Sequence, residues 1–311
     1  MIKIHNFNDL NPCLFVNPVV TVGFFDGVHK GHIYVIRQLL KKAKEFNGEA
    51  VIITLWPHPK RVLYPEKEIK LLNSIDEKIE LLKKTGIHHL IVLPFTHDFS
   101  KTSSFDFLNE ILVKKIGINS LLMGFDNHIG HNRDQYETLV DYANKLGFTI
   151  GKAHIENQNK GRISSSIIRE AVSQGKVDKV NQMLGYNYTL TGKVVKGKEL
   201  GRTIGFPTAN IELDETLKIV PSSGVYAVMA KVNNLMYLGM ANIGIRPTVN
   251  NNINDRSIEI NIFNFDKDIY GHTISVQFIS RMRDERKFSG IEELTLQLIE
   301  DKKFALRLLT E

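Results

Sequence analysis

The sequence is poor in the features that mark secreted and membrane proteins. Its 311 residues include one cysteine, Cys13. A single thiol cannot form an internal disulfide, so the fold does not depend on an oxidising compartment. No apolar run approaches the ~20 residues that a membrane-spanning helix needs, and residues 1–9 lack the apolar core of a signal peptide. These absences predict a cytoplasmic protein without a membrane partner.

Blocks of like charge are also missing. The formal net charge is +6, and no run of like charges forms a basic arm. A surplus this small does not call for nucleic acid as a partner, and it is compatible with polyphosphate substrates. Apolar residues make up 42% and charged residues 24% of the chain, as in ordinary globular proteins. At roughly 150 residues per domain, the length indicates two domains.

The first half of the chain alternates short apolar runs with longer amphipathic stretches. Such alternation is typical of βαβ units, in which helices cover a parallel sheet. Sheets of this kind bind ligands at the carboxyl ends of their strands. The predicted strands are 19–24, 50–55, 89–93 and 120–124, and the predicted helices are 33–46, 75–84, 105–115 and 164–184.

After Gly185 the pattern changes to β-rich runs separated by Gly, Pro, Asn and Asp turns. This change predicts a β-barrel or sandwich with a terminal helix over 291–309. The domain boundary is therefore predicted near Gly185, with domains 1–185 and 186–311. Residues 232–235 are expected to form a hairpin turn. The predicted strands are 189–195, 224–232, 236–243, 257–263 and 273–279.

The strongest motif of the first half is GFFDGVHKGH at residues 23–32, between a predicted strand and a predicted helix. Its glycines let a backbone approach a ligand closely, and a helix N-terminus directs free N–H groups at an anion. His29 and His32 flank Gly31 and can donate to a phosphate as charge builds on it. An isolated motif of this kind could equally be a turn with surface histidines. Three other polar segments follow predicted strands or begin the last helix, where a shared site would form: 54–59, 124–134 and 162–169.

Together these segments resemble the FMN adenylyltransferase module of bacterial bifunctional riboflavin kinase/FAD synthetases, a Rossmann-like member of the HxGH nucleotidyltransferases. The resemblance implies that the phosphate of FMN attacks the α-phosphorus of ATP, giving FAD and pyrophosphate. Because that nucleophile is already an anion, positioning and charge stabilisation matter more than a strong base. The implied catalytic residues are His29, His32 and Arg169, the implied ATP contacts are Gly23, Phe24, Asp26, Gly31, Ser164 and Ser165, and the implied flavin contact is Asp126.

The sequence departs from that family after Gly124. The family often has an aromatic-Arg-Phe triplet where this chain has Asn127, His128 and Ile129, and it often has glycine at the place of Gln135. An aromatic face and a cation are therefore expected to be missing from the flavin side. This departure leaves open a riboflavin kinase whose adenylyltransferase activity is weak or lost.

A glycine-dense, basic segment, 192–210, begins the second half. It is not a Walker loop, because no Gly-Lys-Ser/Thr triplet ends it, but its backbone could wrap a polyphosphate. Thr208 and Asn210 alternate on an extended segment, so their side chains share one face and offer oxygen ligands that suit Mg²⁺. Glu259 is predicted on the strand face opposite the isoleucines, where a carboxylate could be a general base or a solvent-facing side chain.

With its other segments, the second half resembles a riboflavin kinase, which implies a six-stranded barrel. The resemblance implies that Glu259 takes the proton from the ribityl 5′-hydroxyl. It also implies that Thr208 and Asn210 bind the Mg²⁺ beside the transferred phosphoryl group. The implied ATP contacts are Gly197, Lys198 and Gly205, and the implied flavin contacts are Arg283, Glu285 and Phe288. The matching segments, in family order, are 205–210, 221–226, 241–248, Glu259, 270–271 and 283–288.

The chain is therefore predicted to be an α/β enzyme with two sites, making FMN from riboflavin and then FAD from FMN, with ATP and Mg²⁺ in both steps. A flavin-sensing regulatory or RNA-binding protein is the alternative from another class, since the basic first half permits it. The presence of Thr208, Asn210 and Glu259 argues against that alternative, because a binding protein needs no base. The sequence leaves the oligomeric state open.

Overall fold

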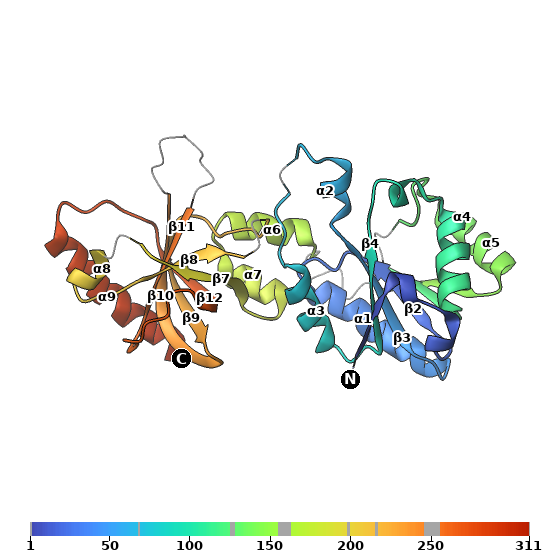
Figure 1. Ribbon diagram of the computed structural model, residues 1–311, viewed down its shortest axis with the longest axis horizontal. Coiled ribbons are helices and arrows are strands. Elements are labelled where there is room, and N and C mark those ends of the chain that lie inside the picture. The colour runs from blue at the N-terminus through green and yellow to red at the C-terminus, as the bar shows by residue number, and fades with distance from the viewer. Residues whose placement is uncertain are drawn as a thin grey trace. The chain divides into compact units, whose positions relative to one another are not determined.

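The chain forms two compact units (Figure 1). The N-terminal unit comprises Met1–Ile69 and Asn73–Ser164, and the C-terminal unit comprises Lys70–Leu72 and Ser165–Glu311. This division places the helices before Gly185 with the second unit, whereas the functional boundary at Gly185 stays a prediction. The structure is a computed structural model that describes residues 2–67, 69–124, 128–154, 163–197, 200–214, 217–245 and 256–310.

A parallel six-stranded sheet in the order β1-β4-β3-β2-β5-β6 forms the centre of the N-terminal unit. Because all strands run the same way, the loops that follow β2, β3 and β5 meet at one edge of the sheet. The strands are β1 (Lys3–Asn6), β2 (Val19–Gly23), β3 (Ala50–Trp56), β4 (His89–Pro94), β5 (Ser120–Met123) and β6 (Thr149–Lys152).

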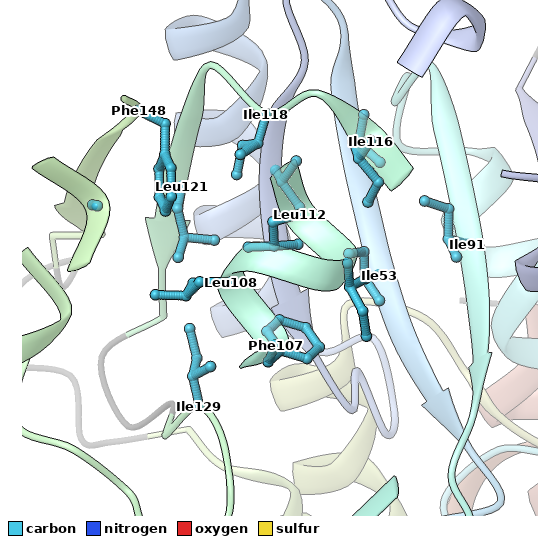
Figure 2. Packing of buried hydrophobic residues seen from close by; sticks show 14 of the residues in the cluster. Ile53, Ile91, Phe107, Leu108, Leu112, Ile116, Ile118, Leu121, Ile129 and Phe148 are labelled. Carbon is cyan, nitrogen blue, oxygen red and sulfur yellow. The ribbon is translucent and has the colours of Figure 1, made fainter. Parts of the chain in front are cut away.

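Apolar side chains cover both faces of this sheet, as expected for parallel strands. Alternate residues of β3 serve opposite cores: Ile53 packs with the helix after β4, and Ile52 packs with α1 and α3. Figure 2 shows the first core, where Phe107, Leu108 and Leu112 pack with residues of the strands. The helices are α1 (Lys30–Glu45), α2 (Pro59–Leu63), α3 (Ile75–Lys83), α4 (Ser104–Asp106), the π-helix η4 (Phe107–Ile116) and α5 (Tyr136–Leu146), with short 3-10 turns η1 (Phe7–Asp9), η2 (Pro12–Leu14) and η3 (Phe99–Lys101).

The four predicted strands of the N-terminal unit are confirmed to within a residue or so, but two others were missed. These two, β1 and β6, form the edges of the sheet, and most of their residues are exposed or half-buried. Edge strands carry no continuous apolar run, so apolar periodicity does not reveal them. Helix α5 was missed as well.

The predicted single helix over 164–184 is wrong, because the chain forms two helices, α6 (Ser165–Ser173) and α7 (Val177–Leu184). Gly175 separates them with a φ of +71°. The Lys176 N–H bonds the Ala171 carbonyl at 2.9 Å and the Gly175 N–H bonds the Val172 carbonyl at 2.8 Å. This pair of bonds is the glycine-dependent C-cap that ends many helices.

A closed six-stranded barrel, in the order β10-β11-β8-β7-β12-β9, forms the body of the C-terminal unit and confirms the predicted barrel. Asn233 and Asn234 both have positive φ, as a tight hairpin turn between β9 and β10 requires. Strand β8 was not predicted as a strand. The elements are β7 (Tyr188–Val195), α8 (Leu200–Thr203), β8 (Ala209–Leu213), β9 (Gly224–Val232), β10 (Leu235–Ile245), β11 (Arg256–Ile262), β12 (Thr273–Arg283) and α9 (Ile291–Thr310).

Helix α9 packs against β9, β10 and β12 of the barrel (Figure 1). Ala305 of the helix lies in a cluster with Ala227, Met240 and Phe263, so the predicted terminal helix covers one side of the barrel wall. None of the helices in the described part of the chain has the length and apolar character that crossing a bilayer requires.

Candidate active sites

His29 begins helix α1 and also caps it. Its Nδ1 accepts a hydrogen bond from the backbone N–H of His32 at 3.3 Å. An imidazole whose Nδ1 accepts must carry its proton on Nε2 when it is neutral, so Nε2 is left as a donor. A Cβ at Gly31 would lie 3.1 Å from the His29 ring, which explains why glycine separates the two histidines. The local sequence therefore sets both the position and the tautomer of His29.

Burial keeps both histidines of the motif neutral. His29 is 5% exposed, and desolvation lowers its pKa to about 4. The pKa of His32 is lowered well below its usual value, first by burial and then by the neighbouring His29 and Lys78. The two rings stack with centroids 3.7 Å apart. His32 Nδ1 is buried and has no hydrogen-bond partner among the described residues, so a bound group could supply one.

Asp26 and Lys78 add a buried pair of opposite charges near these histidines. Asp26 is 4% exposed, and one carboxylate oxygen accepts from the Asn73 backbone N–H at 3.4 Å. Lys78 is 3% exposed, and its ammonium lies 5.4 Å from the ring centroid of Trp56. Burial lowers the Lys78 pKa to about 8, while the charge of Asp26 acts in the opposite direction. Lys78 is a site residue that sequence reasoning missed.

A cavity of about 440 Å³ opens at the strand-end edge of the N-terminal unit. Gly23 and Phe24 line it, as do Phe95, Phe99, Phe107 and Arg133. His128 and Ile129 of the departing triplet line it too, and Asn127 lies outside the described residues. The rings of this cavity come from segments far from that triplet, and its guanidinium comes from Arg133. The absence of an aromatic face and a cation from the flavin side stays a prediction.

The predicted phosphate-binding segment before α6 reaches the motif helix. The Ile163 carbonyl oxygen lies 3.6 Å from the position a Cβ would take on Gly31, so Ser164 directly follows a contact with the motif. Ser165 and Arg169 belong to α6 of the C-terminal unit, where the Arg169 guanidinium donates to Ser166 Oγ at 3.3 Å. Asp126 lies outside the described residues.

The predicted kinase residues meet on two adjacent barrel strands, β8 and β11, and at Thr208 just before β8. Asn210 of β8 pairs with Val195 of β7 on one side and with Glu259 of β11 on the other. Thr208 Oγ1 donates to Glu259 Oε2 at 3.5 Å. Glu259 alternates with the buried Ile258 and Ile260, as predicted for a carboxylate on the opposite face. A hydroxyl, an amide and a carboxylate therefore converge on one patch of the barrel wall.

The glycine-dense segment packs closely on this patch. A Cβ on Gly197 would lie 2.0 Å from Asn210 Nδ2, so only glycine lets the backbone pass so near that side chain. Asn210 is consequently 7% exposed. Gly205 has a φ of +78°, in the left-handed region that favours glycine. Lys198 lies outside the described residues.

A second cavity, of about 230 Å³, is lined both by residues of this patch and by the predicted flavin residues. Thr208 and Glu259 line it together with Arg283, Glu285 and Phe288. Glu285 reaches over β10, because its Oε1 lies 2.7 Å from the position a Cβ would take on Gly244. The structure thus brings five predicted residues to one cavity, and residues of α9 complete its wall.

The fold and these two cavities define a class of protein: a two-unit transferase with a nucleotidyltransferase-like sheet and a kinase-like barrel. The family models for FAD synthetase and riboflavin kinase match residues 15–167 and 184–309. The chain belongs to the bifunctional riboflavin kinase/FMN adenylyltransferase family.

Similarity to individual proteins extends over nearly the whole chain. The Bacillus subtilis bifunctional riboflavin kinase/FMN adenylyltransferase is 39% identical, covering 93% of this chain and 92% of its own. The Haemophilus influenzae protein of that name is 33% identical, covering 97% and 96%. A solved structure from Streptococcus pneumoniae, described as a macrolide-efflux protein, superposes with a TM-score of 0.87 at 31% identity, covering 98% of this chain and 99% of its own.

Proposed function

We propose that this chain phosphorylates riboflavin to FMN in the C-terminal unit and adenylylates FMN to FAD in the N-terminal unit, with ATP as co-substrate in both steps. One observation carries the kinase half: Thr208 and Glu259 contact each other at the wall of a cavity, and Asn210 pairs with Glu259 on the adjacent strand. A pure flavin sensor would need no carboxylate at that place. The kinase step needs a general base, whereas the adenylyl transfer needs stabilisation of charge on phosphate.

In the kinase step Glu259 acts as the general base. Its carboxylate takes the proton of the ribityl 5′-hydroxyl as that oxygen attacks the γ-phosphorus of ATP, and ADP leaves. The Thr208 hydroxyl donates to Glu259 at 3.5 Å and so helps to orient the carboxylate. Gly197 and Gly205, and Lys198 beyond the described residues, are proposed to contact the ATP phosphates. The flavin would lie on the side of Arg283, Glu285 and Phe288, which line the same cavity.

Thr208 and Asn210 are proposed to hold Mg²⁺ beside the ATP phosphates. A hydroxyl oxygen and an amide oxygen on one strand face, with the Glu259 carboxylate nearby, are the hard donors that this ion prefers. Bound there, the ion would neutralise charge on the transferred phosphoryl group. The residues present therefore fit the ion that the family uses.

In the adenylyl transfer the protein stabilises charge rather than removing a proton. The FMN phosphate attacks the α-phosphorus of ATP, and pyrophosphate leaves. His29 and His32, kept neutral by burial, would donate to phosphate oxygens as charge builds on them. Gly23, Phe24, Asp26 and Gly31 are proposed ATP contacts, with Ser164, Ser165 and Arg169 on the β and γ phosphates.

The aromatic cavity of the N-terminal unit supports an active adenylyltransferase rather than a lost one. A flavin ring is planar and largely apolar, and stacked aromatic side chains suit such a ring. Phe24, Phe95 and Phe99 provide that lining, and Arg133 provides a cation for a phosphate. Asp126 stays a proposed flavin contact.

One assay tests both halves. The full chain is incubated with riboflavin, ATP and Mg²⁺, and flavins are separated by chromatography over time. We expect FMN to appear first and FAD to follow. A second incubation with FMN and ATP should give FAD directly; FMN that persists there would indicate a kinase with a lost second activity. A salt-dependent RNA complex without ATP turnover would favour the regulatory alternative.

A further inference from the structure

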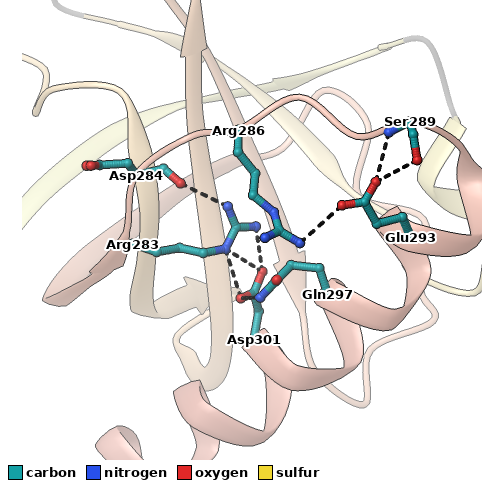
Figure 3. A network of polar contacts seen from close by, with 7 residues as sticks. All are labelled: Arg283, Asp284, Arg286, Ser289, Glu293, Gln297 and Asp301. Atoms are coloured by element: carbon teal, nitrogen blue, oxygen red, sulfur yellow. Dashed lines mark hydrogen bonds and ion pairs between the residues drawn. The ribbon is translucent and has the colours of Figure 1, made fainter.

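Asp301 is a buried carboxylate on helix α9, and the proposed mechanism does not use it. Its side chain is 4% exposed. Arg283 Nε donates to both of its oxygens, at 2.9 and 3.1 Å, and Arg283 Nη2 donates to Oδ2 at 2.7 Å. Gln297, one turn earlier on α9, donates to Oδ1 at 2.8 Å. Figure 3 shows these groups pointing toward one another between the helix and the end of β12.

This arrangement occupies the guanidinium of Arg283 almost completely. Besides the three bonds to Asp301, Arg283 Nη1 donates to the Asp284 carbonyl at 2.9 Å. Two-pronged pairing of a guanidinium with a carboxylate fixes orientation as well as distance. Arg283, predicted as a flavin contact, thus directs its donors toward the protein although it lines the cavity. A different role for it follows from this geometry.

Arg283 lines the kinase cavity, and Asp301 pairs with it from α9. Arg283 lies 5.9 Å from the ring centroid of Phe288, and the Arg286 guanidinium lies 4.7 Å from it. Phe288 and Arg286 line the same cavity as Glu259, together with Leu294 and Leu298 of α9. Arg286 also lies 3.6 Å from Glu293 of α9. The end of β12 and the segment after it are therefore tied to α9 at two points, Arg283 and Arg286.

We propose that Asp301 is a positioning residue for riboflavin. It holds Arg283, and through it the segment 283–288, against α9, so that Phe288 presents its ring to the flavin. This inference rests on the proposed kinase function of the cavity. A buried carboxylate in contact with a guanidinium is costly to leave unpaired, so loss of either partner should release the segment. Loss of the pair should weaken riboflavin binding more than ATP binding.

The test compares Asp301→Asn with Glu300→Gln in the full chain. Glu300 precedes Asp301 on α9 and is exposed, so its substitution makes the same charge change outside the network. For Asp301→Asn we expect the KM for riboflavin to rise about tenfold, because a misplaced binding wall costs affinity. The KM for ATP and FAD formation from supplied FMN should stay within about twofold of wild type. Asp301→Glu should recover part of the riboflavin affinity.

Riboflavin binding is measured separately by quenching of flavin fluorescence. A wild-type chain that neither binds nor phosphorylates riboflavin would overturn the proposed function itself. Equal riboflavin affinity in wild type and Asp301→Asn would overturn only the role of Asp301. If Asp301→Asn does not fold, the double substitution Arg283→Met with Asp301→Leu replaces the pair by apolar groups, which proteins often tolerate. Wild-type riboflavin affinity in that variant would also overturn the proposal.

Discussion

The two candidate sites place their ionisable side chains in different surroundings. In the N-terminal unit burial lowers the pKa of His29 to about 4 and that of Lys78 to about 8. In the C-terminal unit Glu259 lies half-buried on a strand face, with its position set by pairing to Asn210. The difference fits the two proposed reactions, because a phosphate nucleophile is already an anion and needs no base, whereas a hydroxyl must give its proton to one. Substitutions at either site test whether the two sites act independently.

The largest effect is expected from removing the base. Glu259→Gln keeps the shape of the side chain, but it cannot take a proton at neutral pH. FMN formation should fall about 10³-fold, within the range that a general base contributes. FAD formation from supplied FMN should be unchanged, as measured by chromatography of both reactions. Glu212→Gln, an exposed carboxylate on β8, is the matched control. Equal loss of both activities in a folded Glu259→Gln protein would contradict separate sites.

Removing the paired histidines should give the reverse pattern. His29→Ala with His32→Ala removes the donors that lie stacked 3.7 Å apart. FAD formation should fall about 10²- to 10³-fold, as when phosphate-stabilising or oxyanion-stabilising donors are lost. FMN formation should persist. His97→Ala, an exposed histidine of the same unit, controls for the loss of imidazole. Unchanged FAD formation would show that these rings do not serve the reaction.

A smaller effect is expected from a substitution at Gly197, which tests whether Asn210 binds Mg²⁺. Gly197→Ala places a Cβ 2.0 Å from Asn210 Nδ2, so the buried amide must rotate away. We expect kcat/KM for FMN formation to fall about tenfold, with more Mg²⁺ needed for half-maximal rate. Gly290→Ala is the control, since a Cβ there meets nothing within 4 Å. An unchanged Mg²⁺ requirement would argue against Asn210 as a ligand.

The smallest effect concerns stability and pH in the N-terminal unit. The pKa of His29 is about 4 when folded and 6.5 as its ordinary value, so the unfolded chain binds more protons between these values. Stability from this group is therefore lost as pH falls from 6.5 toward 4. From pH 6.5 to about 5 we expect a loss of about 1.5 kcal/mol from His29.

Urea unfolding followed by tryptophan fluorescence measures this loss. The chain has a single tryptophan, Trp56, which lies in the N-terminal unit and so reports on that unit. His29→Asn keeps an acceptor for the helix cap but does not titrate, so its stability should depend less on pH. Identical pH dependence in both proteins would contradict the low pKa of His29.

Much of the fold followed from local pattern, and the failures have separate physical causes. The interior strands β2 to β5 have apolar runs that predict them, whereas the edge strands β1 and β6 have none. The break at Gly175 was missed because apolar spacing continues through it. The cavity of the N-terminal unit draws Phe95, Phe99 and Phe107 from outside the motif, so a motif comparison alone could not find its aromatic lining.

Sequence reasoning predicted the interior strands β2 to β5, the motif around His29 and His32, and the alternation that puts Thr208 and Asn210 on one face. These features can be predicted because each depends on residues that are close together in the sequence. Only the tertiary structure decided that Lys78 is buried near Asp26 and that Asp301 holds Arg283. Lys78 does occupy a position on the apolar face of α3, with Leu82 one turn later, which was the one local signal. The burial of a charge depends on which distant elements pack over it, and periodicity along the chain does not contain that information.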